Sequence, residues 1–172
     1  MNLIKTKLDG LVVLKPTVFK DNRGYFMESY NQKNINKLLG NVNFVQDNES
    51  ESSRGVLRGL HFQKPPYTQA KLVRCLKGSV LDVVLDLRKD SKTYGIFETI
   101  SLTEENKKQL FIPKGFAHGF IVLSKSAIFS YKVDNYYNPD SESGVLWSDL
   151  DLNIDWKINK NEIIVSKKDK NL

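Results

Sequence analysis

Short runs of alternating apolar and polar residues limit the fold of this sequence more than any other feature. Turn-forming residues break the runs about every ten positions, a spacing typical of half-buried β-strands with short connections. One run contains two strands that turn at Lys77-Gly78, so we expect about ten strands. The segments are 10–19, 23–30, 41–50, 56–63, 70–88, 95–102, 108–113, 115–124 and 127–137.

Helix signals are few. Residues 31–40 combine an Asn31 cap, the apolar residues Ile35, Leu38 and Leu39 on one face, and a terminating Gly40. A second short helix is expected near 148–156 or in the tail. The connections are too short for parallel crossovers, so we expect an all-β, antiparallel sandwich or barrel with a few short helices. No linker or repeat divides the chain, which predicts one domain over residues 1–172.

The charge and composition of the sequence limit which kinds of molecule the protein is expected to bind. The 172 residues carry a net charge of +6, but the basic residues are scattered among acids or gathered in a solvated tail. We therefore expect neither nucleic acid nor a membrane as partner. Arg23, Arg58, Lys71 and Arg74 stand in apolar surroundings and are better suited to hold a compact anion. The single cysteine and the absence of a signal-peptide pattern predict a cytoplasmic protein.

Metal and nucleotide cofactors are not expected. The only two histidines, His61 and His118, are far apart in the sequence, with no close pair of ligands beside either. Glycine-rich phosphate-binding motifs and the nucleophile-elbow motif are also missing. The remaining classes are cofactor-free acid–base chemistry and simple binding.

An acid–base site can be assembled from a few residues. His61 is the natural base near neutral pH. By alternation, Lys71 shares a strand face with Val73 and Cys75, and Tyr131 shares one with Phe129 and Val133. The pattern therefore predicts an ammonium group and a phenol that point into the interior.

Two further strands place polar groups inward. Gln46 and Asn48 share a face with Phe44, and interior amides need a polar ligand or partner. Arg58 and His61 would face opposite sides of a regular strand, because they are three residues apart. A bulge at Gly59 would bring both to one pocket; without a bulge, one of the two residues has another role.

Seven segments in order give the sequence a close resemblance to the dTDP-4-dehydrorhamnose 3,5-epimerases, enzymes of the pathway to dTDP-L-rhamnose, a cell-wall polysaccharide precursor. The segments are FKDNRGYFMESYN, FVQDN, VLRGLHFQ, AKLVRC, IPKGFAHGF, YKVDNYYNP and VLWSDLDLNIDW. The resemblance implies a cupin-type jelly roll without metal or cofactor that works as a homodimer.

The resemblance also implies roles for individual residues. His61 matches the family's general base, Asp169 the carboxylate that orients it, Tyr131 the proton donor on the opposite face, and Lys71 the cation beside the keto oxygen. Other positions match contacts to the dTDP-sugar, some of them supplied by the partner chain. These are Phe19, Arg23, Glu28, Gln46, Asn48, Arg58, His118, Tyr137, Glu142 and Lys168.

The implied function is an isomerase that converts dTDP-4-keto-6-deoxy-D-glucose to dTDP-4-keto-L-rhamnose by moving protons at C3 and C5. Relatives that invert one centre, or that act as ketoisomerases on related nucleotide sugars, share much of this frame. A non-catalytic module that binds sugar nucleotides is the remaining alternative. It has no need for a base, an acid and a cation together.

Overall fold

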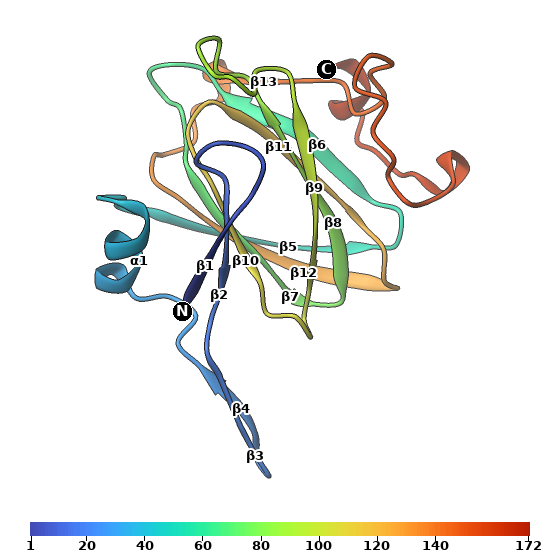
Figure 1. Ribbon diagram of the computed structural model, residues 1–172. Helices are drawn as coiled ribbons and strands as arrows, with labels where there is room; N and C mark the ends of the chain where they lie inside the picture. Colours follow the sequence, from blue (N-terminus) through green and yellow to red (C-terminus); the bar gives the residue numbers. More distant parts are fainter.

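Two antiparallel sheets packed face to face form the body of the protein, in a computed structural model that describes all residues 1–172 (Figure 1). The first sheet has the order β1 (Asn2–Lys5), β2 (Val12–Lys15), β10 (Gln109–Ile112), β7 (Lys71–Lys77), β12 (Ser126–Val133) and β5 (Gln46–Ser53). The second has the order β13 (Glu142–Gly144), β6 (Leu57–Gln63), β11 (Phe116–Val122), β8 (Ser79–Asp86) and β9 (Phe97–Thr103). The predicted antiparallel sandwich is confirmed.

The strand pairing is that of a jelly roll. Strand β8 pairs with β9, β7 with β10, β6 with β11, and β5 with β12. These nested pairs alternate between the two sheets, so that from β5 to β12 every connection except the β8–β9 hairpin crosses from one sheet to the other. The inner faces of β6, β7, β11 and β12 therefore look at one another across the sandwich.

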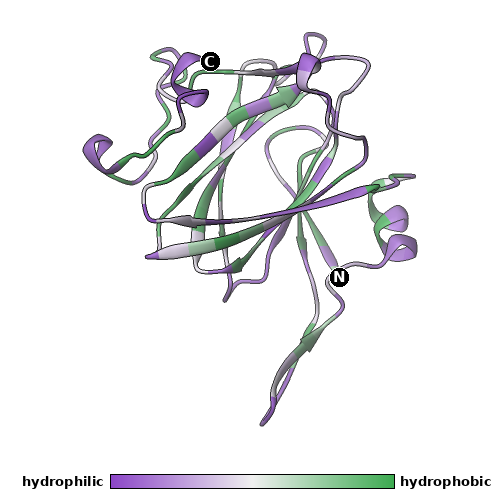
Figure 2. Ribbon diagram, turned by 180° about the vertical axis from the view of Figure 1, so that it is seen from behind, coloured by the Kyte–Doolittle hydropathy of each residue, from purple (hydrophilic) through white to green (hydrophobic).

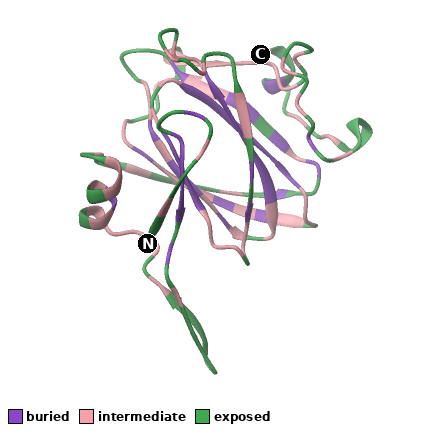
Figure 3. Cartoon of the chain, in the orientation of Figure 1, coloured by how far each residue is buried: buried purple, intermediate pink, exposed green.

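A hairpin leaves this body as a separate arm, formed by β3 (Val18–Asp21) and β4 (Gly24–Met27) (Figure 1). The prediction of one strand over residues 10–19 is wrong, because the chain leaves β2 at Pro16 and enters the arm. Pro16 has no N–H to continue a ladder of hydrogen bonds. Aromatic side chains on the arm face solvent, with Phe19 62% and Phe26 70% exposed (Figure 3).

Two strands were not predicted, and the total is thirteen rather than about ten. Strand β1 consists of only four residues at the N-terminus, and β13 has three residues, none of them large and apolar. Strand β5 was predicted, although its Gln46–Ser53 sequence is entirely polar and it runs as a hydrophilic ribbon along the edge of the first sheet (Figure 2).

The predicted helix over residues 31–40 is confirmed as α1 (Gln32–Leu39). The Asn31 side chain accepts a hydrogen bond from the Asn34 N–H, Ile35 is fully buried, and Gly40 ends the helix at φ +82°. No α-helix forms over 148–156 or in the tail, where only 3₁₀ turns at Lys160–Glu162 and Asp169–Asn171 are present. No helix of the protein has the length and apolar character required to cross a membrane.

Alternation on the central strands of the first sheet works as predicted. Val73 lies opposite Tyr131 and Lys71 opposite Val133, so these four side chains share the inner face. Val73 and Val133 are buried, and Tyr131 packs against the core formed between the sheets. Buried segments of both sheets face each other across this core (Figure 3).

A bulge at Gly59, one of the two alternatives left open by the sequence, is present on β6. His61 lies opposite His118 and Arg58 opposite Phe120, and the register shifts between these two pairs. Gly59, inside the bulge, has φ +124°, a backbone conformation that side chains with a Cβ rarely adopt. As a result, Arg58 and His61 line the same cavity.

Substituting Gly59→Ala should destabilise the fold. The new Cβ would lie 2.5 Å from the Gly119 Cα and 2.8 Å from the His118 carbonyl oxygen. Gly24→Ala is a matched control, because Gly24 has φ +127° but nothing lies within 4 Å of its Cβ position. We expect Gly59→Ala to lower the free energy of unfolding by about 1–3 kcal/mol more than the control does. Urea denaturation of both variants measures the difference, and equal losses would contradict the prediction.

Candidate active site

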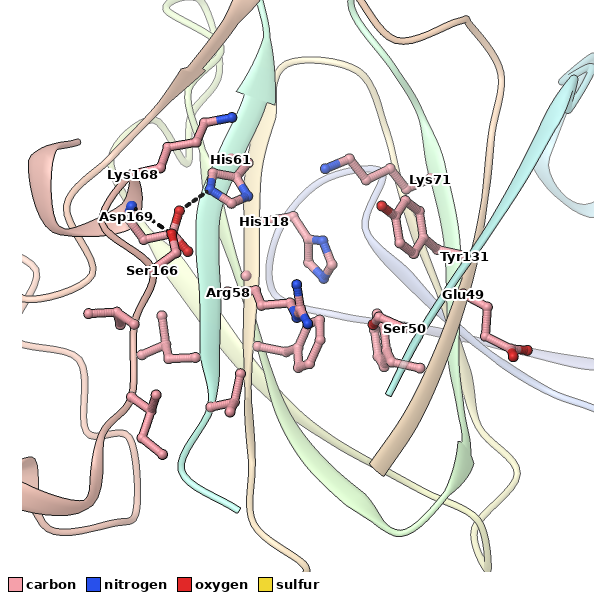
Figure 4. A pocket seen from close by; sticks show the side chains of 17 residues that line it. Glu49, Ser50, Arg58, His61, Lys71, His118, Tyr131, Ser166, Lys168 and Asp169 are labelled. Carbon is pink, nitrogen blue, oxygen red and sulfur yellow. Dashed lines mark hydrogen bonds and ion pairs between the residues drawn. The ribbon is translucent and has the colours of Figure 1, made fainter. Parts of the chain in front are cut away.

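A cavity of 510 Å³ opens between the two sheets. The second sheet contributes Arg58 and His61 from β6 and His118 from β11, while the first contributes Lys71 from β7 and Tyr131 from β12 (Figure 4). The C-terminal segment, residues 160–172, closes one side with Ser166, Lys168 and Asp169. Seven residues predicted from the sequence thus meet around one space: Arg58, His61, Lys71, His118, Tyr131, Lys168 and Asp169.

His61 and Asp169 form a hydrogen-bonded pair on one wall. The His61 Nε2 lies 2.7 Å from the Asp169 Oδ1, and Asp169 is only 3% exposed. An ionised carboxylate only accepts hydrogen bonds, so it holds the imidazole with hydrogen on Nε2 and the lone pair on Nδ1. Figure 4 shows the second ring nitrogen of His61 on the cavity side. The pair therefore has the arrangement of an oriented base.

The C-terminal segment is tied to β6 by backbone hydrogen bonds. Ile164 forms an isolated parallel bridge with Val56: the Leu57 N–H donates to the Ile164 carbonyl at 2.9 Å, and the Ile164 N–H donates to the Gly55 carbonyl at 2.9 Å. The Asp169 N–H then donates to the Ser166 Oγ at 3.0 Å. These contacts fix Asp169 beside His61, although 108 positions separate the two residues.

Lys71 and Tyr131 occupy the opposite wall. Burial lowers the pKa of Lys71 to about 8, against the attraction of the Asp82 and Glu142 carboxylates. Burial also raises the pKa of Tyr131, and the positive charge of Arg58 opposes this effect. At neutral pH the wall therefore presents a protonated phenol and a cation that can lose its charge in mild alkali.

Arg58 and His118 complete the floor. The Arg58 guanidinium donates from Nε at 3.2 Å and from Nη2 at 3.1 Å to the Ser52 Oγ, which fixes its direction. The His118 Nε2 lies 2.9 Å from the Asp82 Oδ2, and both side chains are buried. Burial lowers the pKa of His118, so the ring is neutral at physiological pH.

A small polar cluster stands at the side of His61. Lys168 forms an ion pair with Glu142, and the Tyr137 hydroxyl donates to the same carboxylate. Burial acts to raise the pKa of Glu142, but the hydrogen bonds from Lys168 and Tyr137 outweigh it and hold the pKa below its ordinary value. The cluster joins three residues that the sequence predicted as substrate contacts.

The predicted amides lie on the same sheet face as Tyr131. Asn48 is the register partner of Tyr131 and Gln46 that of Val133. The Gln46 Nε2 donates to the Asn48 Oδ1 at 2.9 Å. The two amides therefore satisfy each other in part and leave further donors and acceptors for a ligand.

Seven predicted residues do not line the cavity within one chain: the amides Gln46 and Asn48, Tyr137 and Glu142 of the polar cluster, and Phe19, Arg23 and Glu28. Phe19 and Arg23 are on the arm, where Arg23 pairs with Asp21 at 2.5 Å. Glu28 accepts hydrogen bonds from the side chains of Asn31 and Asn34 at the start of α1.

Sequence reasoning missed Asp82, Ser52 and Ser166. A signal for Asp82 was present, because Asp82 alternates with Val80 and Val84 on β8, and all three are fully buried. A carboxylate on an apolar strand face is rarely buried without a partner. Ser52 and Ser166 carry no comparable signal, since they stand in polar stretches.

Comparisons with known proteins identify the family of this chain. A sequence model of the family described as dTDP-4-dehydrorhamnose 3,5-epimerase matches residues 5–172. The dTDP-4-dehydrorhamnose 3,5-epimerase of Shigella flexneri is 54% identical over 159 residues, which are 92% of this chain and 88% of that protein.

Solved structures of such enzymes have the same fold. The dTDP-4-dehydrorhamnose 3,5-epimerase from Elizabethkingia anophelis superposes with a TM-score of 0.94 at 55% identity, covering 99% of this chain and 94% of that one. A 3,5-epimerase from Legionella pneumophila, solved in complex with dTDP-4-keto-L-rhamnose, gives a TM-score of 0.93 at 47% identity, covering 98% and 89%. On this evidence the chain belongs to the dTDP-4-dehydrorhamnose 3,5-epimerase family.

Proposed function

We propose that the protein is a dTDP-4-dehydrorhamnose 3,5-epimerase that converts dTDP-4-keto-6-deoxy-D-glucose to dTDP-4-keto-L-rhamnose. One observation carries the proposal in a chain of this family. A base oriented by a carboxylate, His61 with Asp169, faces a phenol and an ammonium, Tyr131 and Lys71, across a single cavity (Figure 4).

The substrate explains why such a set is useful. A ketone at C4 acidifies the hydrogens on C3 and C5, so that either can leave as a proton. Removal of the proton by the His61 Nδ1 gives an enolate and an imidazolium, which the Asp169 carboxylate stabilises. The negative charge moves to the C4 oxygen, where the Lys71 ammonium stabilises it more than it stabilises the neutral ketone.

Inversion requires the proton to return from the other face. Tyr131 belongs to the sheet opposite His61 and can donate its phenolic hydrogen to the carbon from that side. The nearby Arg58 guanidinium favours the phenolate that forms. Each inversion removes one proton and returns one, with no change in the number of electrons, so the reaction itself needs no redox cofactor. Once the His61 imidazolium has released its proton to water and the Tyr131 phenolate has taken one up, repetition at the second carbon completes the change from a D-sugar to an L-sugar.

The diphosphate and nucleoside need cations and flat surfaces. Arg58 and Lys168 line the cavity, and Gln46, Asn48, Tyr137 and Glu142 lie on neighbouring strands and loops. Phe19 and Arg23 are exposed on an arm that projects from the body of its own chain (Figure 1). In the proposal the protein is a homodimer in which each arm supplies these residues to the partner's cavity. A cytoplasmic location is part of the proposal, supported by Cys75, which is free and buried.

Hydrogen exchange tests the function directly. Enzyme incubated with dTDP-4-keto-6-deoxy-D-glucose in deuterated water should place deuterium at C3 and C5, as read by NMR of the product. Label at one carbon only would identify a mono-epimerase, and a moved ketone would identify a ketoisomerase. Binding of dTDP without any exchange would replace the proposal with a non-catalytic binding protein.

His61→Ala should remove the base and leave the nucleotide site intact. We expect kcat to fall by about 10²–10⁴-fold, because general base catalysis contributes that much, while the Kd for dTDP stays unchanged. Lys170→Ala is a suitable control, since Lys170 is exposed beside Asp169 and should keep full activity. Steady-state kinetics and calorimetry measure both quantities. A His61→Ala enzyme that retains more than about 1% of wild-type turnover would argue against this base.

The arm should control assembly and substrate affinity. Light scattering should give twice the chain mass of 19.7 kDa for the wild type. A variant with the arm replaced by a short Gly-Ser linker should give a single chain mass. Arg23→Ala should remain dimeric and raise KM more than it lowers kcat, as expected for a uniform anchor of the substrate. A monomeric wild type, or an unchanged KM in Arg23→Ala, would contradict the role given to the arm.

A further inference from the structure

Asp82 stands out among the buried polar groups of the protein. It lies on β8, is completely buried, and shares its strand face with the apolar Val80 and Val84. Its Oδ2 engages the His118 Nε2 at 2.9 Å, while its Oδ1 is the one buried side-chain oxygen or nitrogen of the protein that has no hydrogen-bond partner. A buried carboxylate in this situation is costly unless a positive charge lies nearby.

Lys71 is a cation in the cavity without a negatively charged partner. Its ammonium group lies in the cavity, yet it forms no ion pair and no side-chain hydrogen bond with any protein group. A direct ion pair would occupy the ammonium and keep it from a ligand. A free ammonium inside a protein tends to lose its proton, since burial favours the neutral amine. A negative charge close to Lys71, but not in contact with it, would keep the ammonium protonated and still leave it free to bind a ligand.

His118 links Asp82 to the cavity that holds Lys71. The His118 ring, to which Asp82 is bonded, lines this cavity between the His61 wall and the wall that carries Lys71 and Tyr131 (Figure 4). The neutral ring fixes the carboxylate without cancelling its charge. Asp82 is also first among the carboxylates that act to raise the pKa of Lys71 against burial, ahead of Glu142.

We propose that Asp82 is a positioning residue of the active site, whose buried carboxylate fixes the His118 ring and supplies a negative charge that keeps the free Lys71 ammonium protonated in the cavity. The role rests on the proposed function, in which Lys71 stabilises the enolate oxygen. Lys71 is the group to which Asp82 contributes, and Asp82 itself touches no substrate atom.

Other charged and titratable groups face Lys71 from every side of the cavity. Glu142 adds a second negative charge, but Lys168 and Tyr137 already share it. Asp169 is likewise engaged by His61. Asp82 is the carboxylate that meets only a neutral ring. The complete set is Glu49 on β5, Arg58 and His61 on β6, Asp82 on β8, His118 on β11, Tyr131 on β12, Glu142 on β13, and Lys168 and Asp169 in the C-terminal segment.

Titration of Lys71 by NMR tests the proposal without substrate. In protein labelled with ¹³C at lysine Cε, the Lys71 signal is the one that disappears in Lys71→Arg. Its midpoint should lie at about 8 in the wild type. In Asp82→Asn it should fall by about 1 unit or more, because a nearby opposite charge shifts a pKa by this amount. An unchanged midpoint in Asp82→Asn would overturn the proposal.

Asp86→Asn is the matched control. Asp86 is a second fully buried carboxylate of β8, but its partner is the Arg88 guanidinium, at 2.7 Å, outside the cavity. Asp86→Asn should lower thermal stability and leave the Lys71 midpoint unchanged. Should Asp82→Asn not fold, the wild-type titration still decides. A midpoint below about 7 would mean that no charge protects the ammonium, and this result would also overturn the proposal.

Kinetics then separate the two proposals. A protonated Lys71 is needed for turnover, so kcat/KM should decline as pH rises through the Lys71 pKa. This alkaline limb should move to lower pH in Asp82→Asn but not in Asp86→Asn. A shifted NMR midpoint without epimerase activity in any variant would support the charge effect of Asp82 and refute the proposed function. A shifted midpoint with an unmoved alkaline limb in an active enzyme would refute the positioning role.

Discussion

The hydrogen bond between His61 and Asp169 is the contact on which the site depends most. It joins β6 of the second sheet to a segment that has almost no regular secondary structure. The segment has its own anchors, the bridge at Ile164 and the Ser166 hydroxyl, so the imidazole does not have to hold the carboxylate in place. This division matters, because the ring must keep one tautomer while its other nitrogen gains and loses a proton.

Around that contact, several charged groups lie close together in and beside the cavity. Three carboxylates there have different partners: Asp169 has an imidazole that becomes charged, Glu142 an ion pair, and Asp82 a neutral ring. Lys71 has no direct partner and lies on the wall where the enolate oxygen is expected. The pattern is that of a preorganised site, in which charges already fixed in place stabilise the negative charge that develops on the substrate during the reaction.

Much of this arrangement could be predicted from the sequence, because half-buried strands can be recognised by their alternation of apolar and polar residues. The inward direction of Lys71 and Tyr131, the α1 helix and the bulge at Gly59 all followed from local pattern, and each is present. Local pattern could not place the C-terminal segment beside β6, because its single-residue bridge has no period to detect. The direction of the arm and the break at Pro16 depend equally on tertiary contacts. Asp82 was detectable by alternation but was read as one more strand residue.

The nested order of the jelly roll has a consequence for how the protein reaches its working form. The groups that surround the cavity come from β6, β7, β11, β12 and the C-terminal segment, and the nested strand pairs close around the β8–β9 hairpin. Contacts of such long sequence separation form slowly compared with local ones, because the intervening loops must first be closed. A partly folded intermediate that held this hairpin alone would therefore contain two of the thirteen strands and none of the groups that line the cavity. Catalytic competence belongs to the last stage of assembly.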